Sequence, residues 1–115
     1  MGDLTKNFSR WEFQCNHCGI YKPPPAHFVA SLQRLRDIVG RPLNMLNTYR
    51  CPYYNRRVGG SPNSQHLHAN AADIPGQYAT LAQVKEAGFG RIGVRRGLVI
   101  HVDNWPGYRN RVFND

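Results

Sequence analysis

The sequence predicts an α+β fold: a small antiparallel sheet with helices packed on one face. Apolar residues recur at helical spacing from Pro25 to Val39, where Gly40 gives a stop signal. Leu98–Asp103 is expected to be a strand, with Val99, His101 and Asp103 on one face and Leu98, Ile100 and Val102 on the other. A chain of 115 residues has room for one core and one site, so we predict a single domain over residues 1–115.

Shorter elements complete the predicted order. Ser9 and Glu12 have the spacing of a capping box, so a short helix is expected to start near Ser9. We predict a strand over Leu43–Tyr49, a helical turn over Pro52–Val58 and a buried strand over Ala69–Ile74. Thr80 is a suitable cap for a helix that runs to Gly88.

The charge balance limits the classes of partner. Fifteen lysines and arginines against seven acidic residues give a net charge of +8, which favours a cell-wall polymer, nucleic acid or acidic membrane face, or serves solubility alone. The basic residues are scattered, so neither a basic arm nor a basic helix is predicted. No long apolar run is present and no leader is visible, so we expect cytoplasmic synthesis without a signal peptide and no stable membrane insertion.

Three cysteines cannot all be paired within one chain, so a complete disulfide framework is excluded. Cys15 and Cys18 form a C-x-x-C pair. One interpretation is a structural zinc clip that Cys51 and a spare histidine would complete. The other is a pair of reduced thiols in a tight turn near Cys51.

Two histidines and an aspartate fall within the ten residues from Ser64 to Asp73, and His101 follows in the predicted strand. A catalytic zinc needs three protein ligands and an open position for water, and His66, Asp73 and His101 provide that set. Asp73 follows two alanines, and burying an unpaired carboxylate costs several kcal/mol. We therefore expect a cation beside Asp73, either Arg50 or a metal ion.

Several segments together resemble the zinc D-alanyl-D-alanine carboxypeptidase family. That family includes phage and bacterial murein endopeptidases and shares its fold with the hedgehog signalling domain. Its signature is S-x-H-x-x-G-x-A-x-D with a later histidine on a strand. The resemblance extends from about Leu4 to Trp105. The segments that carry it are Asn47–Pro52, Asn55, Val58–Gly60, Ser64 and His66 through Asp73–Ile74, and His101–Asp103.

The resemblance implies a role for each matching residue. Zinc is the implied cofactor, with three ligands: His66, Asp73 and His101. Ser64 would lie beside the site as a hydrogen-bonding residue. Arg50 would contact substrate and stabilise developing negative charge. The alternative for Arg50 is an ordinary salt bridge to Asp73 or Asp103.

The chain departs from the family pattern at two positions. Ala69 stands where the family has glycine, a change that an ordinary backbone angle would tolerate. Leu98 stands where well-studied branches carry an acidic general base, three residues before the last ligand. Asp103, about 7 Å along the strand from His101, would be the base or would orient His101 by a hydrogen bond. His68 is the other candidate base.

We therefore expect a zinc peptidase that hydrolyses peptide bonds in peptidoglycan stem peptides or cross-links, as an endolysin does. Its partner would be a peptidoglycan peptide and not nucleic acid, and the protein would act as a monomer. By analogy, phage-type release would bring it to the bacterial cell wall. One alternative is a non-catalytic zinc-containing binding module, which Leu98 favours. A metal-dependent nuclease using His66, His68 and Asp73 is disfavoured, because no basic groove-entering element is evident.

Overall fold

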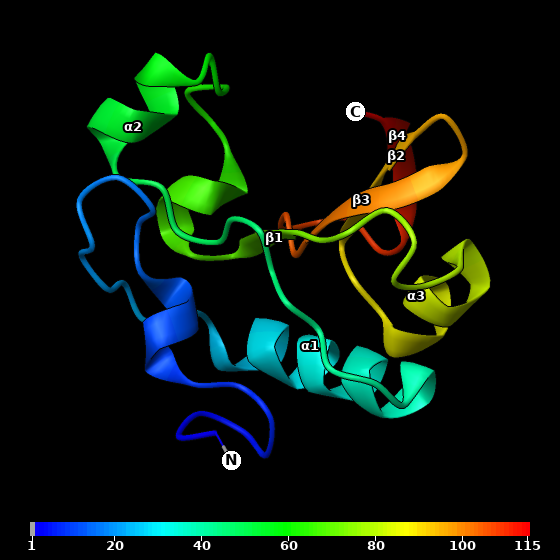
Figure 1. Cartoon of the computed structure of the whole chain (residues 1–115). Helices are drawn as coiled ribbons and strands as arrows, with labels where there is room; N and C mark the ends of the chain where they lie inside the picture. Colours follow the sequence, from blue (N-terminus) through cyan, green and yellow to red (C-terminus); the bar gives the residue numbers. More distant parts are fainter. Residues whose placement is uncertain (1) are drawn as a thin grey trace.

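The structure, a computed structural model, describes residues 2–115. Its helical elements are η1 (Arg10–Phe13), α1 (Ala26–Val39), α2 (Pro52–Arg57), η2 (Gln65–His68) and α3 (Leu81–Ala87), where η denotes a 3-10 helix. Its strands are β1 (Ala71–Asp73), β2 (Arg91–Arg95), β3 (Leu98–Asp103) and β4 (Arg111–Asn114). Figure 1 shows α1 and α3 side by side beneath the sheet, and α2 apart from them. None of the helices described is long and apolar enough to cross a membrane.

The predicted α+β class is confirmed, with a mixed sheet in place of a wholly antiparallel one. The strand order is β1-β3-β2-β4. β3 is antiparallel to both of its neighbours, whereas β4 is parallel to β2. The reason is the connection over residues 104–110, which reverses the chain and passes the start of β2. β4 therefore runs opposite to β3 and in the direction of β2.

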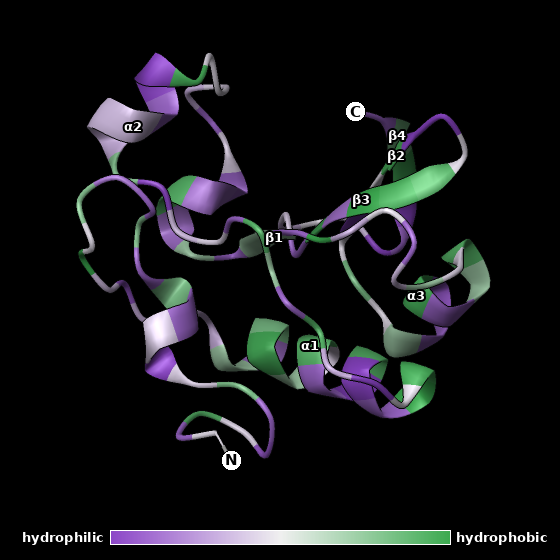
Figure 2. Ribbon diagram, in the orientation of Figure 1, coloured by the Kyte–Doolittle hydropathy of each residue, from purple (hydrophilic) through white to green (hydrophobic). Residues whose placement is uncertain are grey.

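One face of the sheet and the helices beneath it form the hydrophobic core. Ala72, Val102 and Ile92 are neighbours in the register across β1, β3 and β2, and all three are buried. The helical side chains of the same core cluster are Phe28, Val29, Leu32 and Leu35 from α1 and Val84 and Ala87 from α3. Figure 2 shows hydrophobic residues alternating with hydrophilic ones along α1, as expected for a helix with one buried face.

A β-bulge changes the predicted alternation of β3. Val99, His101 and Asp103 would share one face in a regular strand. The register shifts between Gly93 and Val94, so that Gly93 pairs with His101 but Val94 pairs with Val99. The extra residue on β3 turns Val99 into the hydrophobic core, while His101 and Asp103 hydrogen bond on the other face. The bulge thus separates core positions from chemistry-bearing ones within a single strand.

Most of the helices and strands predicted from local sequence signals are present in the structure. The helices near Ser9, Pro52 and Thr80 are present, and α1 begins one residue after Pro25, which is its N-cap. The predicted strand over Leu43–Tyr49 is wrong, because this extended segment makes only one isolated bridge, between Asn47 and Asp73. Its partner β1 is three residues long and offers no room for a longer ladder.

Replacing Leu32 by alanine tests the core. Leu32 is fully buried between α1 and the sheet, so Leu32→Ala is expected to lower the free energy of unfolding by about 2–5 kcal/mol. The matched control is Leu46→Ala, because Leu46 is 60% exposed and its loss should cost less than about 0.5 kcal/mol. Urea denaturation measures both. Equal losses in the two variants would contradict this placement of the core.

Candidate metal centre

The structure brings His66, Asp73 and His101 together on the sheet face opposite the helices. Asp73 and His101 are directly paired across β1 and β3, so their side chains project side by side. His66 comes from η2, the turn that precedes β1. One ligand atom from each of the three residues lies within 4.8 Å of the other two. The three residues predicted as ligands therefore form one cluster.

The orientation of His66 is set by its backbone and by a carbonyl. Ser64 is the N-cap of η2, and its hydroxyl accepts a hydrogen bond from the His66 N–H at 3.2 Å. The His66 Nδ1 lies 2.6 Å from the carbonyl oxygen of Thr48, to which it donates. The other ring nitrogen, Nε2, is left facing Asp73 Oδ1 at 3.2 Å. His66 is thus held in the tautomer that binds a metal through Nε2.

The turn from η2 into β1 contains a strained residue. Ala69 has a φ of 54° and is buried, so it occupies the left-handed region that favours glycine. The ordinary angle that would make alanine harmless at this position is therefore not present, and the strain costs about 1–2 kcal/mol. The Asn70 side chain donates to Gln65 Oε1 at 2.9 Å and to the Asn104 carbonyl at 3.0 Å. These bonds hold the turn closed.

His101 is held between two carboxylates. Its Nδ1 lies 3.2 Å from Asp73 Oδ1, and its Nε2 lies 2.7 Å from Asp103 Oδ2. Asp103 is completely buried, and Arg91 donates to it through both Nη2, at 2.8 Å, and Nε, at 3.1 Å. The Trp105 N–H donates to its second oxygen at 2.9 Å. Asp103 therefore has the position of a carboxylate that orients a metal-binding histidine.

The ionisation of this cluster is strongly perturbed. Burial opposes a charge on His101, but hydrogen bonds to Asp103 and Asp73 outweigh it and raise the pKa of His101 to about 9. Burial also opposes a charge on Asp73, yet hydrogen bonds from His101 and His66 hold the pKa of Asp73 well below its usual range. Burial and the same kind of competing bonds, from His101 and Arg91, leave the pKa of Asp103 lowered. In the metal-free site, His101 is therefore protonated at neutral pH, and this proton occupies the position at which a metal cation would bind.

The donor set fits zinc. Two imidazole nitrogens and one carboxylate oxygen converge, which is the ligand chemistry of catalytic zinc sites with an open fourth position. Each histidine has its second nitrogen held by a protein acceptor, the Thr48 carbonyl for His66 and Asp103 for His101. Such partners fix the ring orientation that metal binding requires.

Arg50 lies against the ligand carboxylate. Its Nη2 is 3.5 Å from Asp73 Oδ2, and its Nη1 donates to Asn55 Oδ1 at 3.2 Å. The Arg50 Nε is buried and has no hydrogen-bond partner within the described residues. A side chain at Gly60 would collide with Asn55 Oδ1, so glycine is required there for Asn55 to reach Arg50. Arg50 is thus positioned beside the predicted metal ligands, with N–H donors that are not used by Asn55 or Asp73.

A cavity of about 840 Å³ opens over these residues. Three arginines, Arg50, Arg91 and Arg95, line it against two aspartates, so guanidinium groups that can bind a substrate carboxylate outnumber the acidic groups. Its other chemistry-bearing or aromatic lining residues include His66, Asp73, His101, Ser64, Trp105, Phe113 and Asp115. The predicted ligands, Arg50 and Ser64 therefore all face the same cavity.

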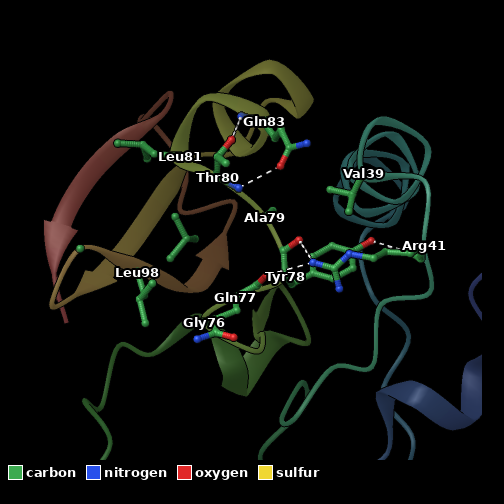
Figure 3. A pocket seen from close by; sticks show the side chains of 12 residues that line it. Val39, Arg41, Gly76, Gln77, Tyr78, Ala79, Thr80, Leu81, Gln83 and Leu98 are labelled. Carbon is green, nitrogen blue, oxygen red and sulfur yellow. Dashed lines mark hydrogen bonds between the residues drawn. The ribbon is translucent and has the colours of Figure 1, made fainter.

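Two of the residues considered from the sequence lie elsewhere. His68 is exposed and does not line this cavity. Leu98 lies against a second cavity of about 510 Å³ between the sheet and α3 (Figure 3). In that cavity Arg41 donates to the carbonyl of Tyr78, and Thr80 and Gln83 exchange capping hydrogen bonds. None of the described residues that line it is a histidine, cysteine or carboxylate, whereas the larger cavity contains the three predicted ligands.

Sequence reasoning missed Arg91 and Asp115. Arg91 binds Asp103 and lies over the rings of Trp105 and Phe113, at 4.3 and 4.5 Å from their centroids. Asp115 follows β4, and its Oδ2 lies 3.0 Å from the position that a Cβ on Gly93 would take, beside His101. Only the pairing of β2 with β3 and β4 brings these residues to the site. Nothing in their local sequence indicates that pairing.

Comparison with known proteins adds one finding. A family model described as Peptidase M15 matches residues 4–103. This range includes all three clustered ligands and most of the chain. No curated protein matches the chain.

The pKa of His101 predicts how zinc binding depends on pH. A pKa of about 9 means that His101 is protonated in the metal-free protein at neutral pH, so zinc must displace a proton. The apparent zinc affinity of this site should therefore rise by roughly tenfold per pH unit and level off above the pKa of His101. Zinc titrations followed at the histidine ring signals by NMR measure this dependence. An affinity that is constant between about pH 6 and 8 would contradict it.

Proposed function

The chain belongs to the peptidase M15 family, and from this premise we propose that it is a zinc-dependent peptidase that hydrolyses peptide bonds in peptidoglycan stem peptides or cross-links. The observation that carries the proposal is the convergence of His66, Asp73 and His101 at the floor of an open cavity. The basic charge of the chain suits an anionic cell wall. An endolysin-like role at the cell wall follows from the same reasoning.

His66, Asp73 and His101 would hold the zinc ion. When bound, zinc would supply the Lewis acidity that polarises the scissile carbonyl and lowers the pKa of water. The residues around it keep the two histidines in the required orientation. The Thr48 carbonyl accepts the Nδ1 proton of His66, and Asp103 accepts the Nε2 proton of His101.

Arg50 is proposed to bind the oxygen that becomes negative during hydrolysis. Its guanidinium lies in the cavity wall, beside Asp73, and each of its Nη atoms carries a second N–H besides the one directed at Asn55 or Asp73. A charged donor that is already in place costs no reorganisation when negative charge develops. Asn55 accepts from Nη1 and keeps the guanidinium in this position.

The proton acceptor must be a group that the cavity exposes. Both oxygens of Asp103 are engaged by Arg91, His101 and the Trp105 N–H, and the residue is fully buried. We therefore assign Asp103 the orienting role that the sequence left open, and we assign proton acceptance to Asp115. Its carboxylate lies in the cavity lining, near His101, and accepts the proton of the water that attacks the carbonyl.

A non-catalytic zinc-containing binding module remains the second candidate. The observation that favours it is Leu98, which replaces the family's acidic residue and lies against the cavity on the other side of the sheet. Such a module would keep the metal ligands and the basic cavity but would hydrolyse nothing.

Digestion of purified sacculi separates the two candidates. The zinc-loaded protein should release muropeptides, a chelator should abolish the release, and added zinc should restore it, because the metal supplies the Lewis acidity. Mass analysis of the products identifies the bond that is cut. His101→Ala serves as the control without a complete ligand set. Binding to sacculi with no release, by protein shown to contain zinc at the histidine centre, would support the binding module.

Two isosteric variants separate the roles of the carboxylates. Asp115→Asn should leave zinc affinity unchanged and lower turnover by about 10²–10⁴-fold, the usual effect of losing a general base. Asp103→Asn should weaken zinc binding by about 10–100-fold, because His101 loses the partner that orients it. Chelator competition and muropeptide release measure the two effects. If Asp103→Asn abolishes turnover with full zinc affinity while Asp115→Asn is fully active, Asp103 is the base.

A further inference from the structure

Cys51, the residue after Arg50, lies beside two cysteines from a distant part of the sequence, Cys15 and Cys18. Cys15 and Cys18 belong to the loop after η1, and Cys51 is the N-cap of α2. Their sulfur atoms lie within 4.8 Å of one another, and none is in a disulfide. This cluster has no part in the proposed hydrolysis, because none of the three residues lines the cavity over His66, Asp73 and His101.

The loop around Cys15 and Cys18 is shaped as a tight knuckle. The Gly19 N–H donates to the Cys15 carbonyl at 2.8 Å, and the Cys15 N–H donates to the Ile20 carbonyl at 2.9 Å. Gly19 has a φ of 74°, which only glycine adopts without strain, so the chain turns back directly after Cys18. The turn places both sulfurs on the side that faces Cys51.

Backbone N–H groups point at the sulfurs. The Cys15 sulfur accepts from the Cys51 N–H at 3.4 Å. The Cys51 sulfur accepts from the Tyr54 N–H at 3.4 Å, as the cap of α2. Donors of this kind stabilise a sulfur that carries negative charge, which is the form that binds a metal.

We propose that Cys15, Cys18 and Cys51 bind a second zinc ion, in a structural site separate from the hydrolytic centre. Three converging thiolates are soft ligands that select zinc over hard cations such as Mg²⁺ and Ca²⁺. Binding releases the protons that the thiols carry. Cys18 is exposed, so the fourth position opens to solvent and is filled by water. The His17 ring is stacked on Tyr54, with centroids 5.7 Å apart, and stays outside the cluster.

The second ion would stabilise the segment of chain that positions Thr48 and Arg50 at the hydrolytic centre. It ties the N-terminal loop to Cys51, the residue after Arg50. The same strip of chain contains Thr48, whose hydroxyl donates to the Glu12 carbonyl at 2.6 Å and whose own carbonyl binds His66. Losing this ion should therefore loosen the segment that positions Arg50 and His66, while the three hydrolytic ligands remain present.

Zinc content of the full chain tests the proposal. Purified protein should contain about two zinc ions, and Cys18→Ser, an exposed substitution, should contain about one. Lys22→Ser, an exposed change in the same loop, is the matched control and should keep both. Replacing zinc by Co²⁺ should give a sulfur-to-cobalt charge-transfer band in the wild type and in Lys22→Ser but not in Cys18→Ser. The band reports thiolate ligation directly, so the test does not require peptidase activity.

Two results would overturn the proposal. One is a wild-type protein that binds a single metal ion without the charge-transfer band, and that keeps this ion in Cys18→Ser. The other is a thiol titration, in denaturant and chelator without reductant, that finds one reactive thiol per chain in place of three, because a disulfide would then occupy the cluster. Loss of peptidase activity alone bears on the hydrolytic centre and leaves this site in place.

Discussion

The pairing of β1 with β3 is the constraint on which the site depends. It sets Asp73 directly opposite His101, and the two side chains then share a face of the sheet. A slip of β1 by one residue would turn Asp73 toward the helices and away from His101, because successive residues of a strand point to opposite faces. Burial of Ala72, Val102 and Ile92 against α1 and α3 opposes such a slip. The hydrophobic core thus determines where the metal ligands lie.

The second constraint on the site is the buried charge of Asp103. Asp103 has no exposed surface, and it is retained because Arg91 and His101 both bind it. Removing one partner of a buried ion pair typically costs about 3–5 kcal/mol, so the network holds its members in a single arrangement. Arg91 is itself packed against the rings of Trp105 and Phe113. The aromatic residues of the cavity therefore support the carboxylate that orients His101.

A series of hydrogen bonds connects the N-terminal part of the chain to the site. Glu12 binds the Thr48 hydroxyl, Thr48 binds His66, and the Arg50 N–H donates to the His66 carbonyl at 3.0 Å. The cysteine cluster lies at the end of this strip, next to Arg50. A metal ion at the cysteines and one at the histidines would therefore hold the same short segment from two sides. In a chain of this length the core alone is small, and bound metal contributes directly to folding free energy.

The sequence alone determined the elements with strong local signals and the ligand types. Helix α1, strand β3 and the set His66, Asp73 and His101 follow from periodicity, capping residues and the motif, which are local properties. Only the tertiary structure decided that Val99 leaves the face of His101, that Ala69 is left-handed, and that Asp103 is enclosed by Arg91. It also decided that Asp115 reaches the site. These features arise from strand pairing and chain reversals between residues distant in the sequence, and no local pattern encodes them.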